Sequence, residues 1–322
     1  MDDLSATLEV TRDDVLRAAE RISQSVLRTE LREVRLNGHP LWLKCECRQT
    51  GGAFKLRGAS NRLLQLDAAE RKRGVVAFSS GNHAQGVALA ARRLGIAATI
   101  VMPSDAPALK IDGTRADGAE IVFFDRLTED RAAIAAEIAS RTGAIVVPSF
   151  DDPHIVAGQG TVGLEILDQL GRSPASIVIP CGGGGLAAGI ALASPDSEIF
   201  IVEPAGWDDM ARSLALGRIV PVAPDALPTL CDALQTPRVS PITFGILSAR
   251  NVTALSVTET EVEAAVRWAW HEQQLVVEPG GAVALAALLA GKVAPQPDSV
   301  IILSGGNIDP ALHARIVSQA TR

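Results

Sequence analysis

The chain of 322 residues contains no tyrosine, and aromatic side chains make up only 3% of it. Without a phenol, any acid–base chemistry must come from lysine, histidine, serine, cysteine or a carboxylate. No apolar run approaches the roughly 18 residues that a membrane-spanning helix needs. The acidic start, Met1-Asp2-Asp3, also lacks the apolar core of a secretory signal peptide. These absences predict a cytoplasmic protein with no membrane partner.

Neither charge nor cysteine content points to a nucleic-acid-binding or zinc-binding protein. The formal net charge is −7 with both signs interspersed, so we expect no nucleic-acid partner. The four cysteines include no C-x-x-C pair of the zinc type. Cys45 and Cys47 would share one face if their segment formed a strand. Reduced thiols in the cytoplasm are the simplest interpretation.

Short β-branched runs alternate with helical segments along nearly the whole chain. The expected strands span residues 75–78, 98–102, 120–124, 145–147, 177–179, 199–202, 252–257 and 300–303. Alanine- and leucine-rich segments of helical period lie between most of them, as at 83–94, 131–141 and 156–170. This rhythm predicts an α/β protein with a largely parallel sheet and helices on both faces.

Three glycine-rich turns follow expected strands, at residues 79–82, 182–185 and 304–307. Because open α/β sheets bind ligands at the carboxyl ends of their strands, we expect these turns to share one crevice. The proline-rich stretch 221–241 interrupts the rhythm and is predicted to be a surface loop. We expect a discontinuous large domain, residues 1–73 and 152–322, with a smaller lobe, residues 74–151, inserted into it.

The most informative turn contains four consecutive glycines and lies between an expected strand and an expected helix. Backbone N–H groups without side chains can close around an anion there, and the helix N-terminus adds the positive end of its dipole. No Lys-Ser/Thr follows the glycines, and the G-x-G-x-x-G spacing is missing. The sequence therefore predicts a phosphate site for a ligand other than a nucleotide, with a flexible glycine turn as the alternative.

Two further segments carry chemistry of their own. Lys55 follows a glycine turn at the expected start of a helix, where burial and the helix dipole would lower the pKa of its amine and make it nucleophilic. A surface lysine is the alternative. The segment 79–83 opens a helix after a strand, either as simple N-cap residues or as a cradle for a carboxylate. Two anion sites and one activated lysine fit a phosphorylated cofactor joined to an amino-acid substrate.

These residues resemble a known family, the fold-type II pyridoxal-phosphate enzymes of the threonine/serine dehydratase (ammonia-lyase) and serine racemase type. The matching segments run in family order from about residue 44 to 307 and are 54–59, 79–83, 157–161, 182–186, 203–204, 278–279 and 304–307. The resemblance implies a tryptophan synthase β-like fold of two lobes, each with a mostly parallel twisted sheet flanked by helices. The larger domain would bind the cofactor and the smaller lobe the substrate.

The resemblance also implies a role for each matching residue. Lys55 would form the imine with the cofactor, and Ser80, on the opposite face, would exchange the Cα proton in a racemase. The residues implied in cofactor binding are Lys55, Phe54, Asn82 (to the 3′-oxygen), Gly182, Gly183, Gly184, Gly185 and Leu186 (to the phosphate), Glu278 and Ser304 (at the pyridine nitrogen). Those implied in substrate binding are Ser79, Ser80, Gly81, Asn82, His83 and Arg131. For Arg131, an ordinary helix-surface arginine is the alternative.

Relatives also suggest a divalent-cation site. Glu203 and Asp209 match its carboxylates and the backbone carbonyl of Trp207 its third ligand, a set that suits Mg²⁺ or Ca²⁺. A turn followed by acids at a helix N-terminus is the alternative. The chain departs from the family pattern at Ala53, usually serine, at Gly280, usually serine, and at Ala233, usually glycine. These departures put the choice of substrate in question.

The implied activity is β-elimination of a β-hydroxy L-amino acid such as threonine or serine, giving a 2-oxo acid and ammonia. An alternative is a serine or hydroxyaspartate racemase/dehydratase that uses Lys55 and Ser80 as a two-face acid–base pair. Cysteine synthase-like β-replacement usually goes with a threonine-bearing phosphate loop, which is absent here. A non-catalytic cofactor-binding protein would not need Lys55, Ser80, Asn82 and Ser304 together. The family implies a homodimer.

Overall fold

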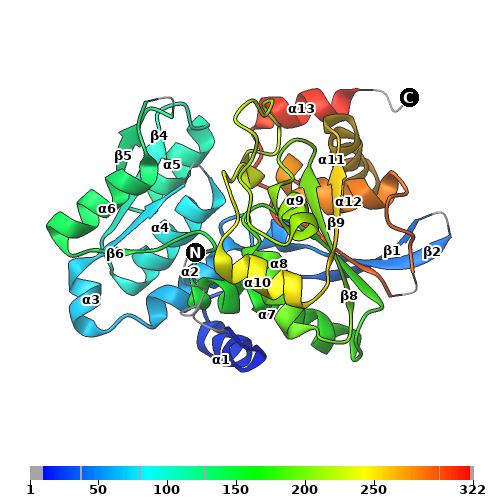
Figure 1. Ribbon diagram of the computed structural model, residues 1–322, viewed down its shortest axis with the longest axis horizontal. Coiled ribbons are helices and arrows are strands. Elements are labelled where there is room, and N and C mark those ends of the chain that lie inside the picture. The colour runs from blue at the N-terminus through cyan, green and yellow to red at the C-terminus, as the bar shows by residue number, and fades with distance from the viewer. Residues whose placement is uncertain (1–9, 37, 80, 127, 297, 320–322) are drawn as a thin grey trace.

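The computed structural model describes residues 10–36, 38–79, 81–126, 128–296 and 298–319. Within them the strands form a six-stranded sheet of order β1-β2-β10-β7-β8-β9 and a four-stranded sheet of order β5-β4-β3-β6. Figure 1 shows the two sheets side by side, each with helices packed around it. The strands are β1 (Leu31–Leu36), β2 (His39–Lys44), β3 (Val75–Phe78), β4 (Ala98–Pro103), β5 (Glu120–Phe124), β6 (Ile145–Val146), β7 (Ser176–Pro180), β8 (Glu198–Pro204), β9 (Thr253–Val257) and β10 (Val300–Ile302).

All strand pairs are parallel except the β1–β2 hairpin at one edge of the larger sheet. The helices are α1 (Arg12–Ile22), α2 (Lys55–Leu64), α3 (Ala68–Arg73), α4 (Asn82–Leu94), α5 (Ala108–Ala116), α6 (Arg131–Thr142), α7 (Pro153–Leu170), α8 (Gly185–Ala193), α9 (Asp209–Leu216), α10 (Pro241–Ala249), α11 (Glu259–Gln273), α12 (Pro279–Leu289) and α13 (Pro310–Ser318), with short 3₁₀ turns η2 (Glu46–Arg48) and η3 (Asp232–Leu234).

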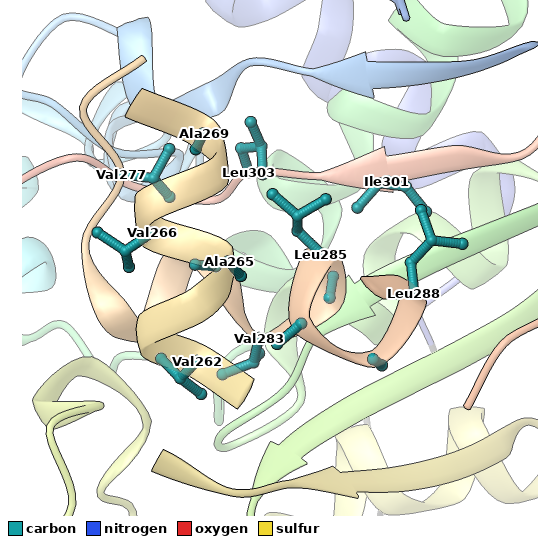
Figure 2. Close-up of a cluster of buried hydrophobic side chains, with 14 of the residues drawn as sticks. Val262, Ala265, Val266, Ala269, Val277, Val283, Leu285, Leu288, Ile301 and Leu303 are labelled. Carbon is teal, nitrogen blue, oxygen red and sulfur yellow. The ribbon is translucent and has the colours of Figure 1, made fainter. Parts of the chain in front are cut away.

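The central strands of the larger sheet are apolar on both faces, as parallel strands covered by helices must be. In β7, Ile177 and Ile179 face the cluster formed with α1, α7, α8 and α10, whereas Val178 faces the other side. That other side packs against α11 and α12, and Figure 2 shows Val266 of α11 and Leu285 of α12 in this cluster with Ile301 of β10. The period-two alternation therefore fixes which helices cover which face.

The smaller sheet is built in the same way. Val75 and Ala77 of β3 face one cluster, together with α4, and Val76 faces another, which holds Ile138 of α6. Helix α2 contributes Leu56 to the first of these clusters. Helix α2 thus packs against the smaller sheet while contacting α7 beside the larger one, and its first residue stands between the two sheets.

The strands expected at 75–78 and 120–124 coincide with β3 and β5, and the other expected strands differ from the observed ones by one or two residues at an end. The β1–β2 hairpin was not among the expected strands. The edge strand β1 has adjacent charged residues, Arg32 and Glu33, and buries only Val34, so its sequence lacks a clear strand signal. The domain boundaries expected near residues 73 and 151 stay a prediction.

Two other expectations need correction. Cys45 and Cys47 do not share a strand face, because the chain leaves β2 at Lys44 and turns through η2; Cys45 is buried and Cys47 half-buried. The stretch 221–241 is only partly a surface loop. Leu227 is 79% exposed, but Cys231 and Leu234 are buried in the core against α12. No helix in the described part of the chain is both long and apolar enough to cross a membrane.

Candidate active site

A cavity of about 660 Å³ lies where the strand ends of the two sheets meet. Ser79 follows β3, Gly182 follows β7 and Ser304 follows β10, and all three residues line this cavity. Lys55, at the start of α2, lines it as well. The three glycine-rich turns therefore share one crevice, as the sequence predicts. Two of them follow β7 and β10, neighbouring parallel strands whose carboxyl ends lie at one edge of the larger sheet, and the third follows β3 of the smaller sheet.

Three of the helices that begin at this cavity lack a side-chain cap, whereas α6 and α10, which also begin there, are capped by Asp130 and Ser240. Helices α2, α4 and α8 have Phe54, Gly81 and Gly184 at the N-cap position and no side-chain hydrogen bond there. By contrast, Thr11 and Asp152 cap α1 and α7 through their side chains. Uncapped N-termini leave backbone N–H groups and the positive end of the dipole available to a bound anion.

The glycine loop shows such free donors most clearly. No backbone N–H group from Gly182 to Leu186 has an acceptor among the described residues. A Cβ atom on Gly183 would lie 2.2 Å from Cδ1 of Phe150, and Gly184 has φ +86°, so side chains are excluded from both positions. The loop thus has the form of a cradle of N–H groups that side chains do not fill.

Lys55 points its amine into this cavity. Its Nζ donates to the backbone oxygen of Ser149 at 3.1 Å and lies 5.1 Å from the centre of the Phe54 ring. Of the described residues that line the cavity, only Lys55 carries an amine. Burial lowers the pKa of Lys55 from 10.5 to about 8. The neutral, nucleophilic form of the amine is therefore far more populated near neutral pH than in an exposed lysine.

The segment 79–83 forms a second set of donors across the cavity. Gly81 donates its N–H to the hydroxyl of Ser79 at 3.1 Å, and the N–H groups of Asn82 and His83 have no acceptor among the described residues. The His83 ring is buried, and Nε2 lies 2.9 Å from the backbone oxygen of Val147. Burial and the nearby charge of Lys55 lower the pKa of His83 to about 3, so the ring is neutral. Ser80 lies outside the described residues.

The side chain of Asn82 is held at both ends of its amide. Its Nδ2 donates to Oε1 of Glu278, and its Oδ1 accepts from Nδ2 of Asn307 at 2.9 Å. Asn307 also donates to Gln85 at 2.9 Å. One N–H of Asn82, which lines the cavity, is left for a ligand. The Ser304 hydroxyl also lines the cavity and has no hydrogen-bond partner within the described chain.

Known proteins resemble this chain over nearly its whole length. Residues 22–305 match the family described as pyridoxal-phosphate dependent enzyme. The chain belongs to this family. It is 43% identical to the L-threo-3-hydroxyaspartate ammonia-lyase of Pseudomonas sp, over 94% of this chain and 97% of that protein. It is 40% identical to the serine racemase of Schizosaccharomyces pombe, over 96% and 98% of the two chains.

A solved structure gives the same result for the fold. A threonine deaminase from T.th. superimposes with a TM-score of 0.85 at 40% identity, covering 92% of this chain and 98% of the other. The expected two-lobe, fold-type II architecture is confirmed. The chain's own residues fit pyridoxal phosphate, because the amine of Lys55 and the unfilled N–H cradle at Gly182 to Leu186 line one cavity.

Two of the departures from the family pattern lie side by side. A Cβ atom on Gly280 would lie 3.3 Å from Cγ of Leu234 and 3.4 Å from Cβ of Ala233. The third departure, Ala53, forms a β-bridge with Gly305. A Cβ atom added to Gly305 would lie 3.2 Å from the Cβ atom of Ala53. Of the three, Ala233 lines the cavity.

Arg131 lines the cavity from the start of α6. Its guanidinium carbon lies 5.7 Å from the centre of the Phe78 ring, and no carboxylate pairs with it among the described residues. Burial is the largest cause that lowers the pKa of Arg131, and Arg126 adds to it. Arg131 therefore lies at the wall of the cavity beside Phe78, and its role in substrate binding stays a prediction.

The expected cation ligands lie behind the phosphate cradle. Both carboxylate oxygens of Glu203 accept backbone N–H groups at the start of α9, from Met210 at 3.0 Å and Ala211 at 2.8 Å. Both oxygens of Asp209 are buried without a hydrogen-bond partner in the described chain. Trp207 donates its indole N–H to Leu227. No group of three or more His, Cys, Asp or Glu side chains in the described chain could hold a metal.

Several residues at the cavity were not among those the sequence predicts. Phe150 packs against the glycine loop, Ser149 accepts from Lys55, and Asp232 and Ser240 line the rim. Asn307 was in a matching segment but had no role assigned. Signals existed for Asn307, next to the glycines that follow β10, and for Asp232, next to the departure at Ala233. Ser149, Phe150 and Ser240 reach the cavity from segments between strands and helices.

Proposed function

We propose that this enzyme is a pyridoxal-phosphate-dependent lyase that eliminates water from a β-hydroxy L-amino acid and releases a 2-oxo acid and ammonia. One observation carries the proposal: the amine of Lys55 and two sets of unoccupied backbone donors line a single cavity. One set suits the cofactor phosphate and the other the substrate carboxylate. The relatives named as hydroxyaspartate ammonia-lyase and threonine deaminase support it.

The chain's own residues would divide the work as follows. Pyridoxal phosphate, when bound, supplies an electron sink for negative charge at the substrate Cα. Lys55, whose neutral amine is favoured by burial, removes the Cα proton at Nζ. The N–H groups at the start of α4 hold the substrate carboxylate, and Asn82 and Ser304 hold the ring. A hydroxyl at position 304 leaves the ring nitrogen less protonated than a carboxylate would, which favours loss of the β-hydroxyl.

Arg131 supports a substrate with an acidic side chain. Its unpaired guanidinium at the cavity could bind a second carboxylate, as the substrate named for the 43% identical relative has. We therefore include L-threo-3-hydroxyaspartate in the proposed substrate class, beside L-serine and L-threonine.

The alternative is racemisation, with Lys55 and Ser80 as acid–base groups on opposite faces of the substrate. The 40% identical relative named serine racemase favours it, and a racemase of this type eliminates water through the same residues. The two activities diverge after the Cα proton is removed: in racemisation a proton returns to Cα from the Ser80 side, and in elimination the bond from Cβ to the hydroxyl breaks and water leaves.

The first test supplies the cofactor-loaded enzyme separately with L-threonine, L-serine, D-serine and L-threo-3-hydroxyaspartate. Release of 2-oxo acid and ammonia from an L-substrate is expected. A Ser80→Ala variant should keep elimination from L-substrates and lose racemisation and D-serine turnover by about 10²–10⁴-fold, the usual contribution of a general acid–base group. If no substrate gives an oxo acid but L-serine loses optical rotation, the racemase alternative replaces the lyase.

A further prediction concerns pH. Since the pKa of Lys55 is lowered to about 8, the cofactor-free enzyme should bind pyridoxal phosphate faster as pH rises, by about tenfold per unit below pH 8, and level off above it. An unperturbed lysine would keep rising to about pH 10.4. The growth of visible absorbance after mixing measures the rate, above pH 6.5 so that the phosphate is doubly ionised. A rate still climbing at pH 10 would rule out the buried amine.

We propose three further properties. A divalent cation, Mg²⁺ or Ca²⁺, is bound by Glu203, Asp209 and the carbonyl of Trp207; the unpartnered oxygens of Asp209 support this. The enzyme is a homodimer, as the family implies. It acts in the cytoplasm, where its four unpaired cysteines would stay reduced.

A further inference from the structure

A buried charge cluster borders the cavity and joins elements of both lobes. Lys110 of α5 is 3% exposed, and its Nζ lies 2.5 Å from Oδ2 of Asp232 in η3. The same Nζ lies 3.8 Å from Oε2 of Glu278, the N-cap residue of α12. Neither Lys110 nor Asp232 belongs to the site that the sequence predicts.

The lysine reaches this position along the substrate-side loop. A Cβ atom on Gly81 would lie 3.1 Å from Nζ and 3.4 Å from Cδ of Lys110, so the side chain runs directly past the backbone of Gly81. The loop that begins α4 and the rim segment at η3 are thus connected through one ammonium group. No other cation is paired with Glu278 or Asp232 in the described chain.

Glu278 connects the cluster to Asn82. Its Oε1 accepts one N–H of the Asn82 amide, and its Oε2 has no hydrogen bond in the described chain and pairs with the Lys110 charge. Because Asn307 donates to the other end of the amide, the orientation of Asn82 depends on an acceptor at Glu278. An ionised carboxylate is the stronger acceptor for this N–H.

The ionisation of Glu278 is finely balanced. Burial raises the pKa of Glu278 to about 7, Lys110 opposes this rise, and Asp232 adds to it. The titratable groups that face Glu278 are the Lys110 ammonium, the Asp232 carboxylate and the Cys231 thiol, whose own pKa is raised by burial. Without the Lys110 ammonium, the carboxylates of Glu278 and Asp232 would repel each other in surroundings that water reaches poorly, and Glu278 would take up a proton.

We propose that Lys110 is a positioning residue for the cofactor: by keeping Glu278 ionised beside Asp232, it holds the Asn82 amide with its second N–H available to the cofactor ring. This inference rests on the proposed function only in taking pyridoxal phosphate as the ligand. It concerns cofactor binding and can be measured without any substrate.

The test compares the dissociation constant for pyridoxal phosphate in the wild type and in Lys110→Met, by titration of the visible absorbance from pH 6.5 to 9. We expect the constant to rise about two- to tenfold at pH 7.5, the effect of losing one hydrogen bond. The pH below which binding weakens should move up by about one unit or more, because a charge about 4 Å from the carboxylate is lost. The titrations of Lys55 and of the cofactor phosphate are common to both proteins and cancel in the comparison.

Two control variants separate charge from packing. Lys110→Arg keeps the charge and should bind the cofactor nearly as the wild type does. Lys292→Met removes the cation of the solvent-exposed pair between Lys292 and Glu261, 2.7 Å apart, and should change nothing. If Lys110→Met leaves the constant and its pH dependence unaltered and only raises KM, the lysine binds substrate directly and the proposal is wrong.

A second variant keeps the test decisive if Lys110→Met fails to fold. Asp232→Asn removes the competing carboxylate from a partly exposed residue at the rim, so Glu278 should stay ionised to lower pH. The pH below which cofactor binding weakens should therefore fall. The same change in the Lys110→Met background should restore part of the lost affinity. An Asp232→Asn protein with the wild-type pH dependence would contradict the proposal. Absence of oxo-acid formation with normal cofactor titrations would instead count against the proposed lyase activity alone.

Discussion

Replacement of Lys55 by alanine is expected to lower the rate of 2-oxo acid formation by at least about 10³-fold. The loss of a general acid–base group alone typically lowers a rate by about 10²–10⁴-fold. The effect should be this large because one residue combines two roles, the covalent tether of the cofactor and the base at Cα. No other described residue that lines the cavity carries an amine that could replace it. The steady-state rate with the best substrate of the panel measures the loss.

The same variant gives a spectroscopic result that is independent of turnover. The visible absorbance that depends on the imine should be absent from purified Lys55→Ala, whereas the phosphate cradle at Gly182 to Leu186 stays intact. Cofactor should therefore still bind, more weakly and without the shifted band. Lys110→Arg is a suitable control, since it alters a lysine next to the cavity without removing its charge. Retention of the band in Lys55→Ala would mean that another amine forms the imine.

The parts of the site that the sequence predicts are those encoded locally. A β-branched run followed at once by glycines and a helical segment marks a strand end, and this places Gly182 and Ser304 at the carboxyl edge of the larger sheet and Ser79 at that of the smaller one. Lys55 is recognisable because it follows a glycine turn at a helix start. The physical rule that parallel strands share their carboxyl edge groups the signals within each sheet. The packing of the two sheets then brings both edges to one cavity.

The parts that escape prediction depend on contacts between distant segments. Lys110 has the surroundings of an ordinary helix lysine in the sequence, and only the fold brings it to Asp232 and Glu278. Phe150 follows a two-residue strand, and nothing nearby indicates that it packs against Gly183. The local sequence around a charged residue does not indicate that its side chain is buried when its ion-pair partner is more than a hundred residues away.

The buried charges around Arg57 are the clearest case of such long-range partners. Arg57 is 0% exposed and binds two carboxylates in bidentate fashion, Glu46 at 2.7 and 2.8 Å and Glu165 at 2.7 and 2.9 Å. Lys44 adds a second cation to Glu165 at 2.6 Å. Two positive and two negative charges thus balance, and they tie α2 to α7 two residues after Lys55.

Arg57→Met is therefore expected to lower the free energy of unfolding by about 3–5 kcal/mol, the cost of breaking a buried pair by removing one partner. Glu46, fully buried, would keep only the Thr29 hydroxyl as a side-chain partner. Arg57→Lys should be destabilised as well, because an ammonium cannot make two bidentate contacts. The shift of the urea unfolding midpoint of the cofactor-free protein, converted with the measured slope, gives the value.

A matched surface pair shows whether burial is the reason. Arg172 makes an equally bidentate contact with Asp298, at 2.9 and 2.6 Å, but its side chain is 56% exposed. Water screens this pair and already solvates both partners, so Arg172→Met should leave the midpoint almost unchanged. Equal shifts for Arg57→Met and Arg172→Met would show that pair geometry, and not desolvation, sets the cost. A large shift confined to Arg57 would mean that the position of the catalytic helix depends on charges no local sequence signal reveals.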